Sequence, residues 1–321
     1  MSFADFRPAP WLRGPHAQTI VSRMFPVPAL PGPVEAIDVP VATGTSIRML
    51  VTRPAGSSRG TVLAIHGLGG SADSAYMRRT AGMAAGRGWT VARLNLRNCG
   101  GTEAIAATLY NAGQSDDAGC ALAAMEARGL PRPYALLGFS LGGNLALRYL
   151  GLAGDASGAD LAAAVNPPID LALCVVSMER PANTLYHAYF TRSLCAHLAR
   201  IRKVRDVPGP KATPRSIGGI RGFDEQFTAP DAGYAGATDY YRGASAGPVL
   251  SGIRRPALVL SSSDDPFVPV AMFDRHRETS RSLRFAHPTA GGHCGYWSAG
   301  RPRFWAADAV LRFFESGGEA A

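Results

Sequence analysis

The clearest chemical pattern in the sequence surrounds Ser140, the central residue of the segment GFSLG at positions 138–142. This G-x-S-x-G pattern follows an apolar run at 134–140, typical of a buried strand, and precedes LGGNLALRYLG, whose leucines have the spacing of a buried helix. A sharp turn from strand to helix holds its central serine exposed on a strained backbone, and small neighbours keep strand and helix from colliding with it. The pattern therefore predicts that Ser140 is a nucleophile at the carboxyl edge of a sheet.

A base for this serine is expected at His293. A serine hydroxyl is a poor nucleophile at neutral pH and needs a base that a third group orients. Of the seven histidines, His293 is the one in a glycine-rich loop, TAGGHCG, after the last expected strand. The other six end strands, lie on helical stretches or lie in the N-terminal arm.

The orienting acid is expected to be Asp265, although Asp264 is its neighbour and both follow a strand expected at 257–263. We choose Asp265 because an acid two residues before an apolar pair, here Phe267-Val268, is the one that such loops usually direct inward. The other aspartate is then expected to cap the loop or face solvent. The resulting chain order, serine then aspartate then histidine, is the order found in α/β-hydrolases.

Acyl attack also produces an oxyanion, which backbone N–H groups in glycine-rich turns stabilise. The amide of Leu141, at the start of the expected helix, is one candidate donor, and the amide of Leu68, in the loop after His66-Gly67, is the other. The GLGG sequence of that loop lacks the lysine of a phosphate-binding loop and the full dinucleotide spacing. We therefore expect no nucleotide and no other cofactor.

The elements that must position these residues begin at residue 61, where short apolar runs start to alternate with amphipathic stretches. This alternation is typical of a parallel α/β sheet flanked by helices. Two upstream runs, VEAIDVPV and SIRMLVTR, are expected to open the sheet as antiparallel strands. We expect one α/β domain over 1–321, with parallel strands at 61–66, 89–96, 134–140, 161–166, 257–263 and 283–287.

The alternation stops between about 170 and 248, which predicts an inserted helical cap. Its segment TLYHAYFTRSLCAHLARI is expected to be a helix with Leu185, Tyr189, Leu194, Leu198 and Ile201 near one face. Two interpretations of this stripe stay open: it packs onto the sheet domain, or it forms a lid that faces lipid.

Charge and composition exclude several other classes of protein. The 321 residues carry a formal charge of +9, but Lys203 and Lys211 are the only lysines and the arginines are scattered. Nucleic-acid binders concentrate their basic residues on one face or tail, so we expect no nucleic-acid partner. The densest basic stretch, 192–215, leaves association with anionic surfaces as an alternative.

The five cysteines are odd in number, widely spaced and without a C-x-x-C pair, which favours reduced thiols over disulfides or a metal site. The N-terminal segment shows no secretory signal, and no run of 18 apolar residues exists. These features predict a cytoplasmic protein without an integral membrane span, and they leave its oligomeric state open.

The sequence resembles the YheT-like branch of the α/β-hydrolases, which includes animal α/β-hydrolase-domain lipases, along nearly its whole length. The shared segments are PHAQT (15–19), HGLGGSADSAYMR (66–78), NLRNCGGTE (95–103), LYNAGQSDD (109–117), GFSLGGN (138–144), FDEQFTAPDAGYAGATDYYRGAS (223–245), the DDPF loop and GGHCGY (291–296). The resemblance implies an α/β-hydrolase fold and hydrolysis of carboxylic esters with Ser140, Asp265 and His293 as the triad.

We therefore expect a serine hydrolase that cleaves esters with short to medium acyl chains through an acyl-enzyme. Leu185, Tyr186, Tyr189 and Phe190 of the inserted segment are expected to shape an acyl pocket, whose apolar lining favours uncharged chains. Two alternatives stay open: a lipid or thioester hydrolase with the same triad, and a non-catalytic binding protein that retains the fold.

Overall fold

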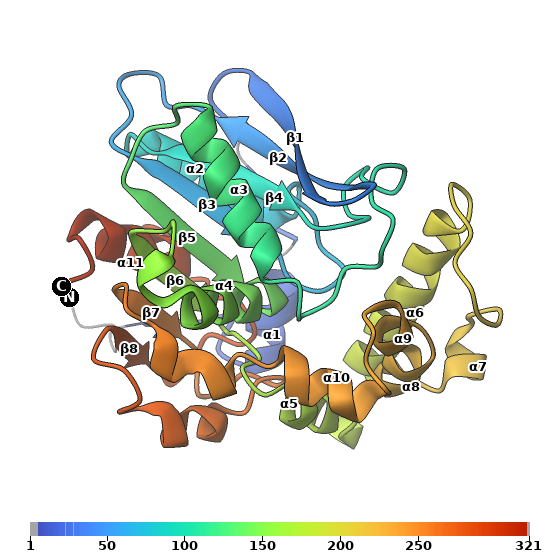
Figure 1. The fold of residues 1–321 in the computed structure, drawn as a ribbon. Helices are drawn as coiled ribbons and strands as arrows, with labels where there is room; N and C mark the ends of the chain where they lie inside the picture. The colour runs from blue at the N-terminus through green and yellow to red at the C-terminus, as the bar shows by residue number, and fades with distance from the viewer. Residues whose placement is uncertain (1–5, 23, 28, 320–321) are drawn as a thin grey trace.

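A single eight-stranded sheet forms the centre of the computed structural model, which describes residues 6–22, 24–27 and 29–319 (Figure 1). The strand order is β1-β2-β4-β3-β5-β6-β7-β8. The strands are β1 (Val34–Ala42), β2 (Thr45–Thr52), β3 (Thr61–Ile65), β4 (Thr90–Asn95), β5 (Tyr134–Phe139), β6 (Leu161–Val165), β7 (Ala257–Leu260) and β8 (Leu283–Ala286).

The parallel part of this sheet confirms the expected fold class. Strands β3 to β8 pair in parallel, while β1 with β2 and β2 with β4 are antiparallel. Every residue of β3, β5 and β6 is buried. Strands covered on both faces need a continuous apolar run, and the sequence has such runs at these positions.

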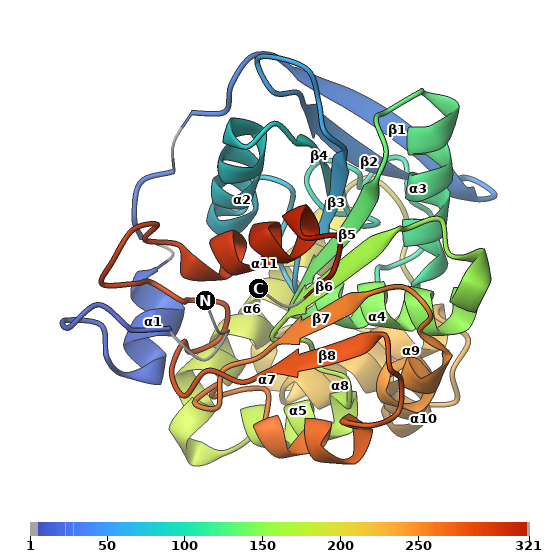
Figure 2. The same ribbon diagram turned by 90° about the vertical axis from the view of Figure 1, so that its left-hand side faces the viewer.

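Helices cover both faces of the sheet, and each face has its own apolar core (Figure 2). On one face lie α2 (Ala75–Gly86) and α11 (Trp305–Glu315), packed on alternate strand residues such as Val62 and Leu137. On the other face lie α3 (Asp116–Ala127) and α4 (Leu141–Ala153), packed on Leu63 and Leu136. The period of two along each strand divides its side chains between the two cores.

A run of helices separates β6 from β7 and lies together at one side of the sheet (Figure 1). These elements are α5 (Leu171–Met178), η2 (Pro181–Asn183), α6 (Thr184–Ile201), α7 (Pro214–Ile217), α8 (Ile220–Phe223), the π-helix η3 (Asp224–Thr228), α9 (Ala229–Asp231), α10 (Ala237–Ala244) and η4 (Gly247–Gly252). The remaining helices are α1 (Pro15–Val21), η1 (Gly154–Ala156) and η5 (Val270–His276). Within the described residues, no helix has the length and apolar character needed to cross a membrane.

The buried face of α6 differs from the expected one. Leu194, Leu198 and Ile201 are buried, but Leu185 is 84% exposed and Tyr189 56% exposed. At 3.6 residues per turn, Leu185 lies about half a turn around the helix from Leu194, so the two cannot share a face. The expected stripe therefore combined residues from opposite sides of α6.

Candidate active site

The turn between β5 and α4 holds Ser140 in a backbone conformation that serine rarely adopts, with φ 51° and ψ −120°. Its amide donates a hydrogen bond of 2.8 Å to the carbonyl of Val165 on the neighbouring strand. Its carbonyl accepts from the amides of Gly143 at 2.8 Å and Asn144 at 3.1 Å, which begins the helix. Hydrogen bonds from both elements thus hold the strained residue in place.

Two glycines make this turn possible, as the G-x-S-x-G pattern predicts. A Cβ atom on Gly142 would lie closer than 3.0 Å to the carbonyl oxygens of Ile65 and His66, at the end of β3. A Cβ atom on Gly138 would come equally close to the carbonyl of Gly142 itself. Any larger residue at either position would push the helix away from the sheet.

The structure brings Ser140, His293 and Asp265 together. The Nε2 atom of His293 lies 2.8 Å from the Oγ atom of Ser140, and its Nδ1 atom lies 2.8 Å from Oδ2 of Asp265. The side chain of Asp265 is fully buried and that of His293 is 6% exposed. Because the carboxylate accepts, the proton of a neutral imidazole is held on Nδ1, which leaves the Nε2 lone pair facing the serine hydroxyl.

The carboxylate of Asp265 is held by three further donors. Its Oδ1 atom accepts from the amides of Phe267 at 2.8 Å and Val268 at 3.1 Å. Its Oδ2 atom accepts from the side chain of Asn166 at 2.6 Å. The apolar pair after the acid therefore contributes through its backbone, since turning Phe267 and Val268 inward aims both amides at the carboxylate.

Asp264 has a separate place in the same loop. Its Oδ1 atom accepts a hydrogen bond of 2.8 Å from the amide of Gly292, the residue before His293. The two adjacent aspartates thus contact adjacent residues of the histidine loop, one through the imidazole and the other through the backbone.

Asn166, which no motif in the sequence indicated, connects three parts of the site. It follows β6 with φ 49°, a conformation that asparagine tolerates better than most residues. Its side-chain amide donates to Asp265 and, at 3.3 Å, to the carbonyl of Gly292, and its oxygen accepts from the amide of Cys294 at 3.3 Å. The sequence does hold a signal for this residue: Asn166 directly follows a buried strand, and so lies at the sheet edge that carries Ser140.

The PHAQT segment lies in α1 and contacts the histidine loop, a role the sequence left unexplained. The Oγ1 atom of Thr19 accepts from the backbone amide of His293 at 2.9 Å and donates to the carbonyl of Pro15 at 2.7 Å. Gln18 makes two hydrogen bonds with the backbone of Trp297, one in each direction. Helix α1 thus fixes the backbone on both sides of the loop.

Leu68 and Leu141, the expected oxyanion donors, both line the cavity that holds Ser140. The hydrogen bonds of the described residues leave both of their amides without an acceptor. The loop of Leu68 is fixed on either side, because the Gly67 amide donates to the Tyr76 hydroxyl at 2.9 Å and the Gly69 amide to the Tyr110 hydroxyl at 3.0 Å.

His66, directly before this loop, is buried and neutral. Desolvation lowers its pKa to about 4, although the hydrogen bond with the carbonyl of Gly67 opposes the shift. Its Nε2 atom accepts from the amide of Leu96 at 3.3 Å, so Nδ1 carries the proton that the carbonyl of Gly67 accepts. This histidine connects the loop to the residue after β4, and it makes no hydrogen bond with Ser140.

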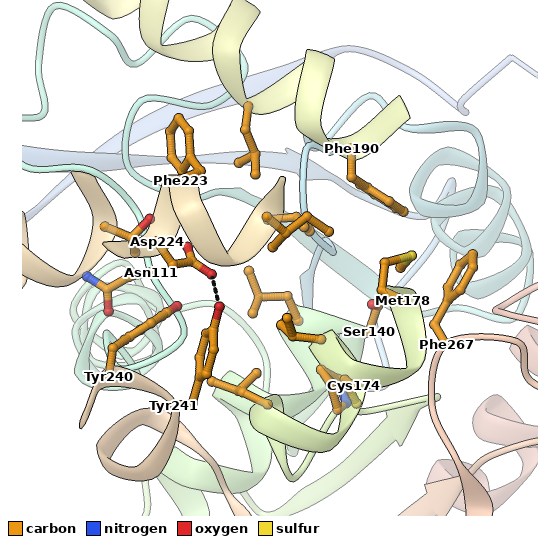
Figure 3. A pocket seen from close by; sticks show the side chains of 18 of the residues that line it. Asn111, Ser140, Cys174, Met178, Phe190, Phe223, Asp224, Tyr240, Tyr241 and Phe267 are labelled. Atoms are coloured by element: carbon orange, nitrogen blue, oxygen red, sulfur yellow. Dashed lines mark hydrogen bonds between the residues drawn. The ribbon is translucent and has the colours of Figure 1, made fainter. Parts of the chain in front are cut away.

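A cavity of about 130 Å³ extends from Ser140 between the sheet and helices α5, α6, α8 and α10 (Figure 3). Its walls near Ser140 are apolar, and of the four expected pocket residues Phe190 lines it. Tyr186 packs on Phe267 and His16, Tyr189 lines a second, outer hollow beside Ser140, and Leu185 faces solvent.

Asp224, Tyr240 and Tyr241 lie at the end of the cavity opposite to Ser140 (Figure 3). Among the described residues, no cluster of three or more potential ligands is arranged to hold a metal ion.

Comparisons with known proteins agree with this architecture. A family model described as alpha/beta hydrolase fold matches residues 60–299. "Putative esterase YheT" of Escherichia coli (strain K12) is 29% identical over 300 residues, which cover 92% of this chain and 88% of that protein. Human "Phospholipase ABHD3" is 27% identical and "Monoacylglycerol lipase" of Saccharomyces cerevisiae 26% identical. These matches confirm the resemblance to the YheT-like branch.

The alignments cover different shares of these relatives. The match with the human protein covers 77% of this chain and 61% of that protein, and the match with the yeast protein covers 79% and 58%. The chain thus spans about three fifths of the length of these two relatives.

Solved structures share the fold at low sequence identity. The crystal structure of 2,6-dihydroxy-pseudo-oxynicotine hydrolase superposes with a TM-score of 0.62 at 17% identity, covering 95% of this chain and 74% of that chain. Est1E from Butyrivibrio proteoclasticus gives a TM-score of 0.56 at 12% identity, covering 88% and 98%. At this identity the likeness concerns the fold alone.

Proposed function

This chain belongs to the α/β hydrolase fold family, and from that premise we propose that it is a serine esterase with Ser140 as nucleophile. The observation that carries the proposal is the continuous hydrogen-bond path from Ser140 through His293 to Asp265, with 2.8 Å at each step. Relatives named esterase, lipase and phospholipase support hydrolysis of an ester as the reaction.

In the proposed first step, Nε2 of His293 accepts the proton of Ser140 as Oγ attacks the carbonyl carbon of the ester. The imidazolium that forms lies beside the buried carboxylate of Asp265, which stabilises its charge and holds the ring. The hydrogen bonds from Asn166, Phe267 and Val268 hold that carboxylate in this orientation.

The tetrahedral intermediate carries a negative oxygen, which the amides of Leu68 and Leu141 are proposed to bind. Both amides are free of other acceptors among the described residues, and Leu141 is the first residue of α4, where the helix dipole favours an anion. His293 then gives its proton to the leaving alcohol, and an acyl-enzyme on Ser140 results. Water activated by the same imidazole releases the acid.

The shape of the cavity supports esters with short to medium acyl chains. Its apolar walls near Ser140, among them Leu171, Met178 and Phe190, suit an alkyl chain and disfavour a charged one. The outer hollow beside Ser140, lined by Tyr189 and Ser193, is proposed to hold the alcohol part. Helices α5 to α10 are proposed to act as the cap, over about 170–248, that closes the acyl side.

The test is hydrolysis of a p-nitrophenyl ester together with labelling by a fluorophosphonate. Ser140→Ala and His293→Ala are expected to lower kcat/KM by about 10⁴-fold or more, and Ser140→Ala to abolish labelling. Ser251→Ala, which changes an exposed serine of η4, is the matched control and retains both. A wild-type protein that neither labels nor hydrolyses would favour the alternative of a non-catalytic binding protein.

A further inference from the structure

The end of the cavity remote from Ser140 is polar, and esterase chemistry does not account for it (Figure 3). Asp224 is buried there, and its Oδ2 atom accepts a hydrogen bond of 2.8 Å from the Tyr241 hydroxyl. Leucine or phenylalanine at this position would suit an alkyl chain better, because burying a carboxylate that is not paired with a cation lowers the stability of the fold.

The cation whose charge acts on this carboxylate, Arg221, also has partners of its own. Arg221 lies over the ring of Tyr241 at 5.5 Å and forms an ion pair of 3.5 Å with Glu179, and its side chain is 42% exposed. Burial therefore dominates and raises the pKa of Asp224 to about 6, while Tyr241, Thr228 and Arg221 lower it only in part. The fold maintains an acid here at a cost in stability.

The local backbone is also unusual. Asp224 begins a π-helix, Asp224–Thr228, whose first and last residues both line the cavity. Segments of π-helix are rare and occur frequently at functional sites.

The two adjacent tyrosines of α10 offer opposite hydrogen-bonding functions to a ligand. Tyr241 donates its proton to Asp224, so its oxygen is left as an acceptor, alongside the carboxylate. Tyr240 accepts from the amide of Ala112 at 2.9 Å, and the described residues provide no acceptor for its own proton. The end of the cavity thus combines acceptors with one free donor, which matches an alcohol hydroxyl, a group that donates and accepts at once.

We propose that Asp224, Tyr240 and Tyr241 bind a hydroxyl group at the far end of the acyl chain, so that the preferred substrates are esters of ω-hydroxy fatty acids. This proposal rests on the esterase function of Ser140. The chain enters between the apolar walls, and its terminal hydroxyl donates to the Asp224–Tyr241 pair and accepts from Tyr240. A methyl-terminated chain of equal length leaves these buried groups unpaired.

The experiment compares p-nitrophenyl esters of ω-hydroxy and unsubstituted acids in matched pairs from six to ten carbons. At the best-fitting length, wild-type protein is expected to favour the hydroxy ester about tenfold or more in kcat/KM. Asp224→Leu reverses the preference, and Tyr241→Phe reduces it. Asp224→Asn, which keeps an acceptor, retains most of it. Leu171→Met, on the apolar wall, changes both esters alike and leaves their ratio unchanged.

The outcomes separate this inference from the proposed function. Equal hydrolysis of both esters at every length, or a ratio that Asp224→Leu does not alter, overturns the hydroxyl site and leaves the esterase standing. A larger preference for an ω-amino ester overturns the assignment to a hydroxyl. If wild type hydrolyses neither ester, the esterase proposal fails. Calorimetric titration of Ser140→Ala with both esters then tests whether the hydroxyl site binds its ligand. Tighter binding of the hydroxy ester supports it, and equal or absent binding overturns it.

Discussion

At the scale of single residues, the candidate site depends on side chains whose positions are fixed by the surrounding backbone and by hydrogen bonds. Ser140 adopts φ 51° between Gly138 and Gly142, and a Cβ atom at either glycine would clash with carbonyl oxygens. His293 lies between a carboxylate and a hydroxyl at 2.8 Å on each side. Side chains held so closely need little reorganisation for the proposed proton transfer.

The adjacent aspartates are expected to differ sharply when replaced. Asp265→Ala removes the group that orients the imidazole, so kcat is expected to fall by about 10⁴-fold. Asp264→Ala removes one acceptor from the amide of Gly292 and is expected to cost less than about tenfold in kcat and about 1 kcal/mol in stability. Steady-state hydrolysis and urea unfolding of both variants check this. Equal losses of activity would contradict the assignment of Asp265.

The glycine pair of the turn gives a second prediction. Gly142→Ala forces a Cβ atom against the carbonyls of Ile65 and His66, and we expect it to destabilise the protein by about 3 kcal/mol or more and to abolish hydrolysis. Gly82→Ala, in the middle of α2 with open space at its Cβ position, is the control and is expected to stabilise by about 0.5–1 kcal/mol. Urea unfolding measures both. Wild-type stability of Gly142→Ala would show that the turn relaxes more easily than its geometry indicates.

At the scale of elements, helix α1 is a support for the histidine loop although it lies far away in the sequence. Thr19 accepts from the amide of His293, and Gln18 bonds the backbone of Trp297. The loop itself has no regular secondary structure between β8 and α11 apart from isolated bridges. Such a loop needs contacts from neighbouring elements to hold one catalytic geometry.

Thr19→Val tests this support. The change leaves the buried amide of His293 without an acceptor, so kcat is expected to fall about tenfold while KM changes little. Thr191→Val is the matched control, because Thr191 is equally buried and its hydroxyl likewise bonds the carbonyl four residues earlier, but that hydroxyl makes no hydrogen bond with the histidine loop. Thr19→Ser keeps the hydroxyl and is expected to restore kcat. A fall in thermal stability without a change in kcat would mean that α1 is structural only.

At the scale of the whole molecule, burial of neutral histidines makes stability depend on pH. Desolvation lowers the pKa of His66 and of His197 to about 4, and for His197 the charge of Arg200 adds to the effect. The unfolded chain binds a proton at each histidine as the pH falls through about 6.5, whereas the folded protein does so only near 4. Stability is therefore full above pH 6.5 and is lost as the pH falls toward 4.

Urea unfolding at pH 7 and pH 5 measures this dependence. Each of the two histidines is expected to remove about 2 kcal/mol over this interval, and the raised pKa of Asp224 offsets about 1 kcal/mol, because the folded protein takes up a proton there near pH 6. His197→Gln, which cannot titrate, is expected to reduce the loss by about 2 kcal/mol. An unchanged loss in this variant would show that other groups govern acid unfolding.

The sequence by itself determined the sheet and which residues lie at its edge. Short continuous apolar runs bounded by glycine-containing turns favour strands buried on both faces, and the G-x-S-x-G turn follows one of them. Because carboxyl ends of parallel strands meet at one edge, residues after β5, β7 and β8 were expected together, and Ser140, Asp265 and His293 lie there.

Only the tertiary structure decided how that edge is supported and what shape the cavity has. Asn166, Thr19 and Asp264 reach the histidine loop through hydrogen bonds across more than 25 positions of sequence, and no local periodicity records such contacts. The orientation of α6 depends on which neighbours cover it, so Leu185 faces solvent although its residue type favours burial. The polar end of the cavity combines a π-helix with α10, two segments whose meeting depends on long-range packing.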